Sequence, residues 1–86
     1  MTWAVYMILC SDDSIYTGIS TDVDRRFEQH ANKTGARYFR GRAPSKVIYL
    51  ENGHDRSSAS KREAAIKRLT RRDKQQLLLA PTNQIA

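Results

Sequence analysis

The sequence has 86 residues, of which 40% are hydrophobic and 28% charged, a composition typical of one globular domain with one modest core. No run approaches the roughly 20 apolar residues that a membrane span requires. The single cysteine, Cys10, excludes an internal disulfide and a multi-cysteine zinc site. The first residues lack the pattern of a secretory signal, so the protein is expected in the cytoplasm.

The net charge of +6 is unevenly distributed along the chain. Three basic and five acidic residues lie within 1–36, whereas twelve basic and four acidic residues lie within 37–74. Ten of the fifteen basic residues are arginines, whose guanidinium groups suit phosphates. The basic half therefore predicts a polyanionic partner and favours nucleic acid over a membrane surface. A solvated basic surface is the alternative.

The first half of the chain predicts a β-hairpin followed by a helix. Residues 3–10 and 15–19 are rich in aromatic and β-branched side chains, and a polar turn separates them. Gly18, inside the second strand, indicates a bulge or the close approach of a ligand. A helix is expected over residues 22–32. Its cap is expected at Ser20 or Thr21, and its inner face is formed by Val23, Phe27, His30 and Ala31.

The second half predicts a basic loop over residues 32–46, one strand and two helices. The expected elements that follow are a strand over 46–51, a turn over 52–55 and helices over 58–69 and 71–79. Residues 81–86 are expected to form a flexible tail behind a domain of residues 1–80. The order β-β-α-β-α-α predicts an α+β domain with a three-stranded, mainly antiparallel sheet.

Several side chains do not fit a simple core. Glu63 falls on the apolar stripe of the second predicted helix, where a carboxylate is costly unless it is paired or binds a cation. Tyr6 and Tyr16 lie on adjacent strands, and a buried phenol needs a hydrogen-bond partner. Arg26 and His30 lie one helical turn apart, which suits an anion site or a packed ion pair. The structural alternatives are a salt bridge for Glu63 and ordinary sheet packing for the tyrosines.

Taken together, these residues resemble the GIY-YIG nuclease superfamily, and in particular its small bacterial single-domain members. The resemblance covers residues 3–76 and includes the loop over 35–42. Its motif pieces are Ala4-Val5-Tyr6, Tyr16-Thr17-Gly18, Arg26 with His30, and Glu63. The first tripeptide departs from the family pattern, because alanine and valine replace its glycine and isoleucine while the tyrosine is kept.

The resemblance implies a phosphodiesterase that cleaves DNA, in repair or processing, with one divalent metal ion, Mg²⁺ or Mn²⁺, held by Glu63. It also implies that Tyr6 and Tyr16 border the site, that Arg26 contacts the scissile phosphate, and that His30 assists proton transfer or orientation. These residue types suit the reaction, which needs an activated water, neutralised phosphate charge and help for the leaving oxygen. Mg²⁺ keeps several waters, so one carboxylate can suffice. Whether a tyrosine or the histidine acts as the base stays open.

The second hypothesis is a nucleic-acid-binding module that keeps this fold without catalysis, and RNA is an alternative ligand to DNA. Binding would depend strongly on salt and would involve no metal-dependent turnover. Tyr38 or Phe39 would stack on bases. The expected nucleic-acid contacts are Thr17, Gly18, Arg37, Tyr38, Arg40, Arg42, Lys67 and Arg68, and Arg71 and Arg72 could also follow the backbone.

Overall fold

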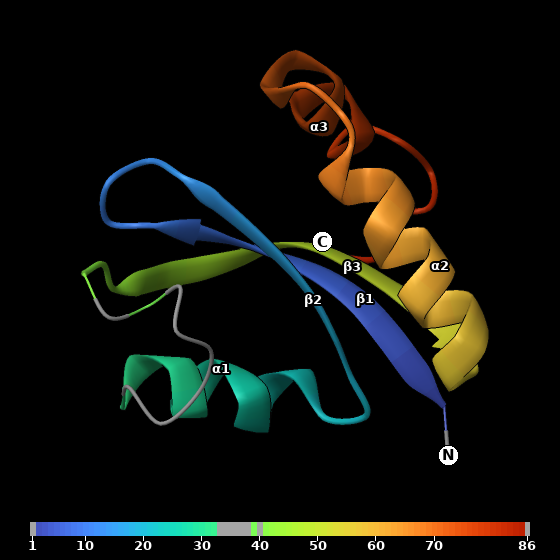
Figure 1. The fold of residues 1–86 in the computed structure, drawn as a ribbon, viewed down its shortest axis with the longest axis horizontal. Helices are drawn as coiled ribbons and strands as arrows, with labels where there is room; N and C mark the ends of the chain where they lie inside the picture. The colour runs from blue at the N-terminus through green and yellow to red at the C-terminus, as the bar shows by residue number, and fades with distance from the viewer. Residues whose placement is uncertain (1, 33–38, 40, 86) are drawn as a thin grey trace.

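The computed structural model describes residues 2–32, 39 and 41–85. The elements in chain order are β1 (Trp3–Cys10), β2 (Ile15–Ser20), α1 (Val23–Ala31), β3 (Pro44–His54), α2 (Arg56–Lys67) and α3 (Arg71–Leu77) (Figure 1). The strands form one antiparallel sheet in the order β2-β1-β3. The predicted α+β fold and its order of elements are confirmed. Within the ranges described, no helix has the length and apolar character to cross a membrane.

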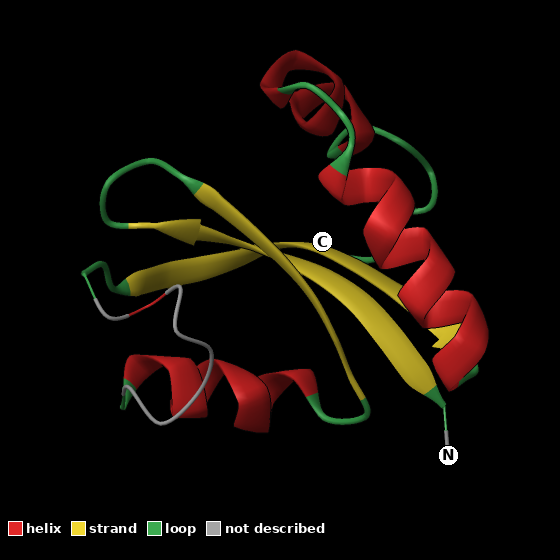
Figure 2. Ribbon diagram, viewed as in Figure 1, coloured by secondary structure: helices red, strands yellow, loops and turns green. Residues whose placement is uncertain are grey.

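The central strand β1 is buried because helices cover both faces of the sheet (Figure 2). Side chains of a strand alternate between its faces. Val5 and Met7 belong to a hydrophobic cluster with Ala59 and Ile66 of α2. The next cluster contains Tyr6, Ile8, Cys10 and Phe39, and Val23 and Phe27 of α1 pack against it. The sheet therefore separates α1 from α2, and β2 and β3 are its two edges.

Both of the first two helices begin at an aspartate. Asp22 accepts a hydrogen bond from the backbone N–H of Arg25, and Asp55 forms a capping box with Ser58. The expected cap at Ser20 or Thr21 is therefore wrong. The hydroxyl of Ser20 instead bonds the backbone of Asp22 and supports the cap from outside the helix. α2 consequently starts at residue 56, two positions earlier than predicted.

The third strand is longer than predicted and continues through the residues that were expected to form a turn. Gly53 has a φ of 84°, which a glycine adopts without strain. Between the pairs Trp3–His54 and Val5–Glu51, β3 contains one residue more than β1. The residues that predicted a turn therefore form a β-bulge at Gly53, and the pairing of β3 with β1 continues beyond it.

The last residues differ from the predicted flexible tail, because hydrogen bonds attach them to the outer edge of β3. The Asn83 side chain accepts from the N–H of Leu50 and donates to the carbonyls of Ile48 and Leu78. The N–H of Gln84 donates to the carbonyl of Leu50. The segment thus uses main-chain groups of β3 that no neighbouring strand pairs.

Glu51 links β3 to α2, and we expect its replacement to weaken the fold. Its side chain, 13% exposed, accepts hydrogen bonds from Tyr49, His54 and Arg62. Burial raises the pKa of Glu51, but these donors outweigh burial and lower it. The ionised Glu51 therefore stabilises the fold fully at pH values above the pKa that this carboxyl has in the unfolded chain. The stabilisation is lost as the pH falls through the lower pKa of Glu51 in the folded state.

Glu51→Gln should accordingly reduce the free energy of unfolding at pH 7 by about 2 kcal/mol. The difference from the unmodified protein should shrink as the pH falls through the lowered pKa of Glu51 in the folded state. Urea denaturation at several pH values measures both effects, with Glu28→Gln on the exposed side of α1 as the control. A difference that stays constant with pH would contradict this role for the carboxylate.

Candidate active site

The hairpin of β1 and β2 positions two phenols beside a glycine. Tyr6 and Gly18 are directly opposite each other in the regular register of the two strands. A Cβ atom at Gly18 would lie 2.7 Å from the Tyr6 hydroxyl and 3.0 Å from the ring of Tyr16. The glycine therefore makes room for the two rings, whose centroids are 6.2 Å apart. The expected bulge at this position is wrong, and a phenol of the protein itself makes the close approach.

Helix α1 contributes an imidazole and a guanidinium to these phenols. His30 is completely buried, and its Nε2 atom lies 3.0 Å from the Tyr6 hydroxyl. Arg26, one turn earlier, donates a hydrogen bond to Gln29 at 2.9 Å. The prediction that the inner face of this helix includes Ala31 is wrong, because that residue is exposed. The hydrogen bond to Tyr6 supplies the polar partner that a buried phenol requires.

Burial controls the protonation of the three rings. It raises the pKa of Tyr6, which the neighbouring phenol raises further and Arg26 only partly lowers. The pKa of Tyr16 is raised as well, mainly by burial. Burial, assisted by the charge of Arg26, lowers the pKa of His30 to about 4. At neutral pH the phenols are therefore protonated and the imidazole is neutral, with a lone pair that can accept a proton.

Helix α2 brings one carboxylate to this group from the other face of the sheet. Glu63 lies between the buried residues Ala59 and Ile66, and its side chain is 24% exposed. Its negative charge raises the pKa of both Tyr6 and Tyr16. Figure 1 shows β2 passing between α1 and α2. Tyr6, Tyr16, Arg26 and His30 therefore lie together on the α1 side of the sheet, and Glu63 on α2 acts on the two phenols through its charge.

The salt-bridge alternative for Glu63 is realised only weakly. Lys67 lies 3.7 Å from one carboxylate oxygen, and its side chain is 53% exposed. An exposed pair of this length contributes little to stability. In the part of the chain that the structure describes, no three potential metal ligands cluster together. A partly exposed carboxylate whose partner in residues 2–32, 39 and 41–85 is a weak one fits Mg²⁺ or Mn²⁺, which retain several waters and need few protein ligands.

The residues expected to contact nucleic acid fall into three groups. Arg37, Tyr38 and Arg40 lie outside the described residues. Lys67 and Arg68 are exposed at the end of α2. Arg42 forms an ion pair with Asp12, with 3.1 Å between Nε and the carboxylate. The nucleic-acid contacts of these six residues therefore remain predictions.

Three further expectations about nucleic-acid contacts need correction, because the side chains are covered. Thr17 is 2% exposed, and its hydroxyl has no hydrogen-bond partner among the described residues. Gly18 lies beneath the tyrosine rings. Phe39 is 1% exposed, so it has no free face on which a base can stack. The sequence analysis did not predict that Phe39 is buried. The only indication in the sequence was an apolar ring in an otherwise basic segment.

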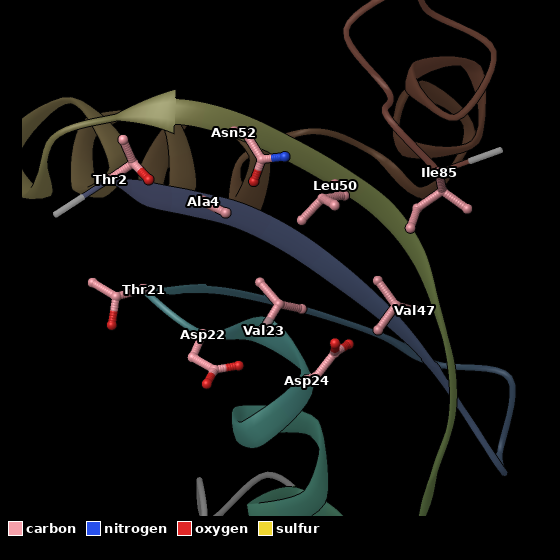
Figure 3. Close-up of a pocket in the computed structure, with 10 residues that line it drawn as sticks. All are labelled: Thr2, Ala4, Thr21, Asp22, Val23, Asp24, Val47, Leu50, Asn52 and Ile85. Carbon is pink, nitrogen blue, oxygen red and sulfur yellow. The ribbon is translucent and has the colours of Figure 1, made fainter.

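A hollow of about 300 Å³ lies away from these residues, at the start of α1 (Figure 3). Carboxylates of Asp22 and Asp24 stand on one side of it, and apolar side chains of β1 and β3 on the other. None of the predicted site residues lines it. Carboxylates repel phosphate, so this hollow does not suit a nucleic-acid backbone.

Comparison with known proteins agrees with the arrangement. Residues 2–76 match the model of the GIY-YIG catalytic domain. The UPF0213 protein of Desulfotalea psychrophila is 47% identical over 79 residues, which cover 91% of this chain and 72% of that protein. The UPF0213 protein of Haloquadratum walsbyi is 49% identical over 73 residues, covering 85% and 82% respectively.

A solved structure shows the same fold. The solution structure of the UPF0213 protein from Bacillus halodurans is 39% identical to this chain, with a TM-score of 0.61. The match covers 98% of this chain and 89% of that one. The family model, the UPF0213 relatives and the fold lead to one conclusion: the chain belongs to the GIY-YIG family.

Proposed function

We propose that the protein is a divalent-metal-dependent nuclease that cleaves phosphodiester bonds of DNA in the cytoplasm, in repair or processing. The observation that carries this proposal is the hydrogen bond between Tyr6 and His30, set beside Arg26 and within the electrostatic influence of Glu63. A general acid–base pair, a phosphate ligand and a cation ligand are the components that this reaction needs.

In hydrolysis, a water oxygen forms a bond to phosphorus while the bond to the leaving oxygen breaks. The water loses a proton and the leaving oxygen gains one. Arg26 would donate hydrogen bonds to the phosphate oxygens and offset their growing charge. Tyr6 would take the proton of the water as its own hydroxyl proton passes to the Nε2 atom of the neutral His30, and the leaving oxygen would gain a proton from the solvent. A divalent cation bound by Glu63 would supply positive charge that lowers the pKa of nearby phenol and water.

The departures from the family tripeptide do not remove any of these groups. Val5 belongs to the cluster on the α2 side of the sheet, and Ala4 lines the separate hollow near α1. Tyr6 keeps its position and its hydrogen bond to His30. This observation favours catalysis over the alternative of a binding module without activity.

Cleavage assays with Arg26→Ala test the proposal. Labelled single-stranded, nicked, branched and duplex DNA, with matched RNA, is incubated with the protein in Mg²⁺, Mn²⁺ or EDTA. We expect metal-dependent cleavage of DNA that falls by at least about 10²-fold in Arg26→Ala, since a donor to the developing charge is lost.

The matched control is Arg25→Ala, which removes the same charge from an exposed position on the same helix. Equal losses in the two variants would show a general charge effect and contradict the assigned role of Arg26. Salt-dependent DNA binding by the unmodified protein, without cleavage under any metal condition, would instead establish the binding module.

A further inference from the structure

Phe39 belongs to the structure of the site although its sequence neighbours are basic. Its ring is 1% exposed and lies against the imidazole of His30, with ring centroids 4.3 Å apart and planes inclined by 32°. The same ring meets Tyr16 edge-on at 4.9 Å and 60°. Aromatic pairs prefer such tilted and edge-to-face contacts. Phe39 thus touches two site residues and contributes no polar group to them.

The surroundings of His30 show what this ring does. Among the described residues, titratable and charged groups that face the imidazole include Tyr6 on β1, Tyr16 on β2 and Arg26 on its own helix. Phe39 adds an apolar cover. Burial is the largest influence on the pKa of His30, so removing the cover should expose the imidazole to water.

The connection that carries Phe39 is also attached near its end. The Ala43 carbonyl accepts a hydrogen bond from the backbone N–H of Ser11 at 2.8 Å, and the Ala43 N–H donates to the Ser11 hydroxyl at 3.1 Å. The ion pair of Arg42 and Asp12 lies at the same turn. The turn of the β1–β2 hairpin therefore fixes the C-terminal end of this connection. Phe39 is the residue by which the connection contacts the interior of the site.

We propose that Phe39 is a positioning residue: its ring closes the Tyr6–His30 pair off from water and holds the imidazole against the phenol. The consequence for cleavage rests on the proposed nuclease function, whereas the effect on the imidazole does not. The segment between α1 and β3 then has two roles, since its basic side chains are expected to bind nucleic acid and its aromatic ring maintains the site.

The test compares Phe39→Leu with Phe27→Leu, a change of the same kind in a residue that packs against the same cluster. The pKa of His30 is measured by NMR titration of its ring protons, with His54, which contacts Glu51 and Ser58, as the internal reference. We expect the pKa to rise by at least about one unit toward 6.5 in Phe39→Leu and to stay within a few tenths of a unit in Phe27→Leu.

In cleavage assays, the acidic limb of the pH–rate profile should move upward by a similar amount in Phe39→Leu. An unchanged pKa of His30 in this variant, or an equal rise in both variants, would overturn the proposal. If the leucine variant does not fold, Phe39→Met gives the same measurement with nearly the same volume and no flat ring. If the unmodified protein lacks nuclease activity, the proposed function fails, while the titration still decides the role of Phe39.

Discussion

Glu63→Gln should abolish metal-dependent cleavage, by on the order of 10³-fold or more, while the fold and DNA binding are retained. The amide has nearly the same shape as the carboxylate but carries no charge to bind a divalent cation. The fold should tolerate the change, because the side chain is partly exposed and its ion pair among the described residues is a long one to Lys67. Cleavage rates in Mg²⁺ and in Mn²⁺, together with urea denaturation, measure these effects.

Binding of Mn²⁺ provides a second measurement that does not depend on activity. This paramagnetic ion should broaden the ring signals of Tyr6 and Tyr16 in the unmodified protein and much less in Glu63→Gln, because the charge of this carboxylate acts on both phenols. Glu28→Gln, which removes an exposed carboxylate of α1, is the matched control. Equal cleavage by the two variants, or equal broadening in them, would remove Glu63 from the metal site.

Gly18→Ala should damage the site and the fold together. The new methyl group would lie 2.7 Å from the hydroxyl of Tyr6 and 2.8 Å from the ring carbon that carries it. The ring has little room to yield, because Tyr6 is 1% exposed and its hydroxyl bonds His30. We expect a loss of about 1–3 kcal/mol in the free energy of unfolding, as for other overpacked cores. Cleavage should fall at least about tenfold, since a displaced phenol loses its hydrogen bond.

Gly41→Ala is the natural control for this substitution. Apart from its chain neighbours, a methyl group at Gly41 would meet no described atom within 4 Å, so the stability and activity of Gly41→Ala should match those of the unmodified protein. Urea denaturation and cleavage rates compare the two variants. A Gly18→Ala protein as stable and active as Gly41→Ala would show that the tyrosine rings can move aside freely.

The fold was predictable because its signals are local. The apolar run of β1 predicted a buried strand, and the helical spacing of Val23, Phe27 and His30 predicted α1 and these members of its inner face. The grouping of Glu63 with the residues of α1 and the hairpin was a different matter, because α1 and α2 cover opposite faces of the sheet. Spacing along the chain could not bring them together, and only the resemblance to a known family did.

The errors arose where long-range contacts outweigh local ones. The role of Gly18 depends on the cross-strand register, which places it opposite Tyr6. Phe39 was judged by its charged neighbours in sequence, although the packing against His30 decides its position. Asn83 looked like part of a frayed end because its partners on β3 are more than thirty residues away.

The attachment of Asn83 and Gln84 has a consequence for how the protein must be handled. A bare outer strand offers its amides and carbonyls to any other chain, and such edges seed aggregation. The final residues occupy those groups at alternate positions, namely Ile48, Leu50 and Asn52. A shortened form that ends before Thr82 would leave the outer edge of β3 uncovered. Residues 82–85 therefore protect the protein against edge-to-edge aggregation and should be kept in recombinant forms.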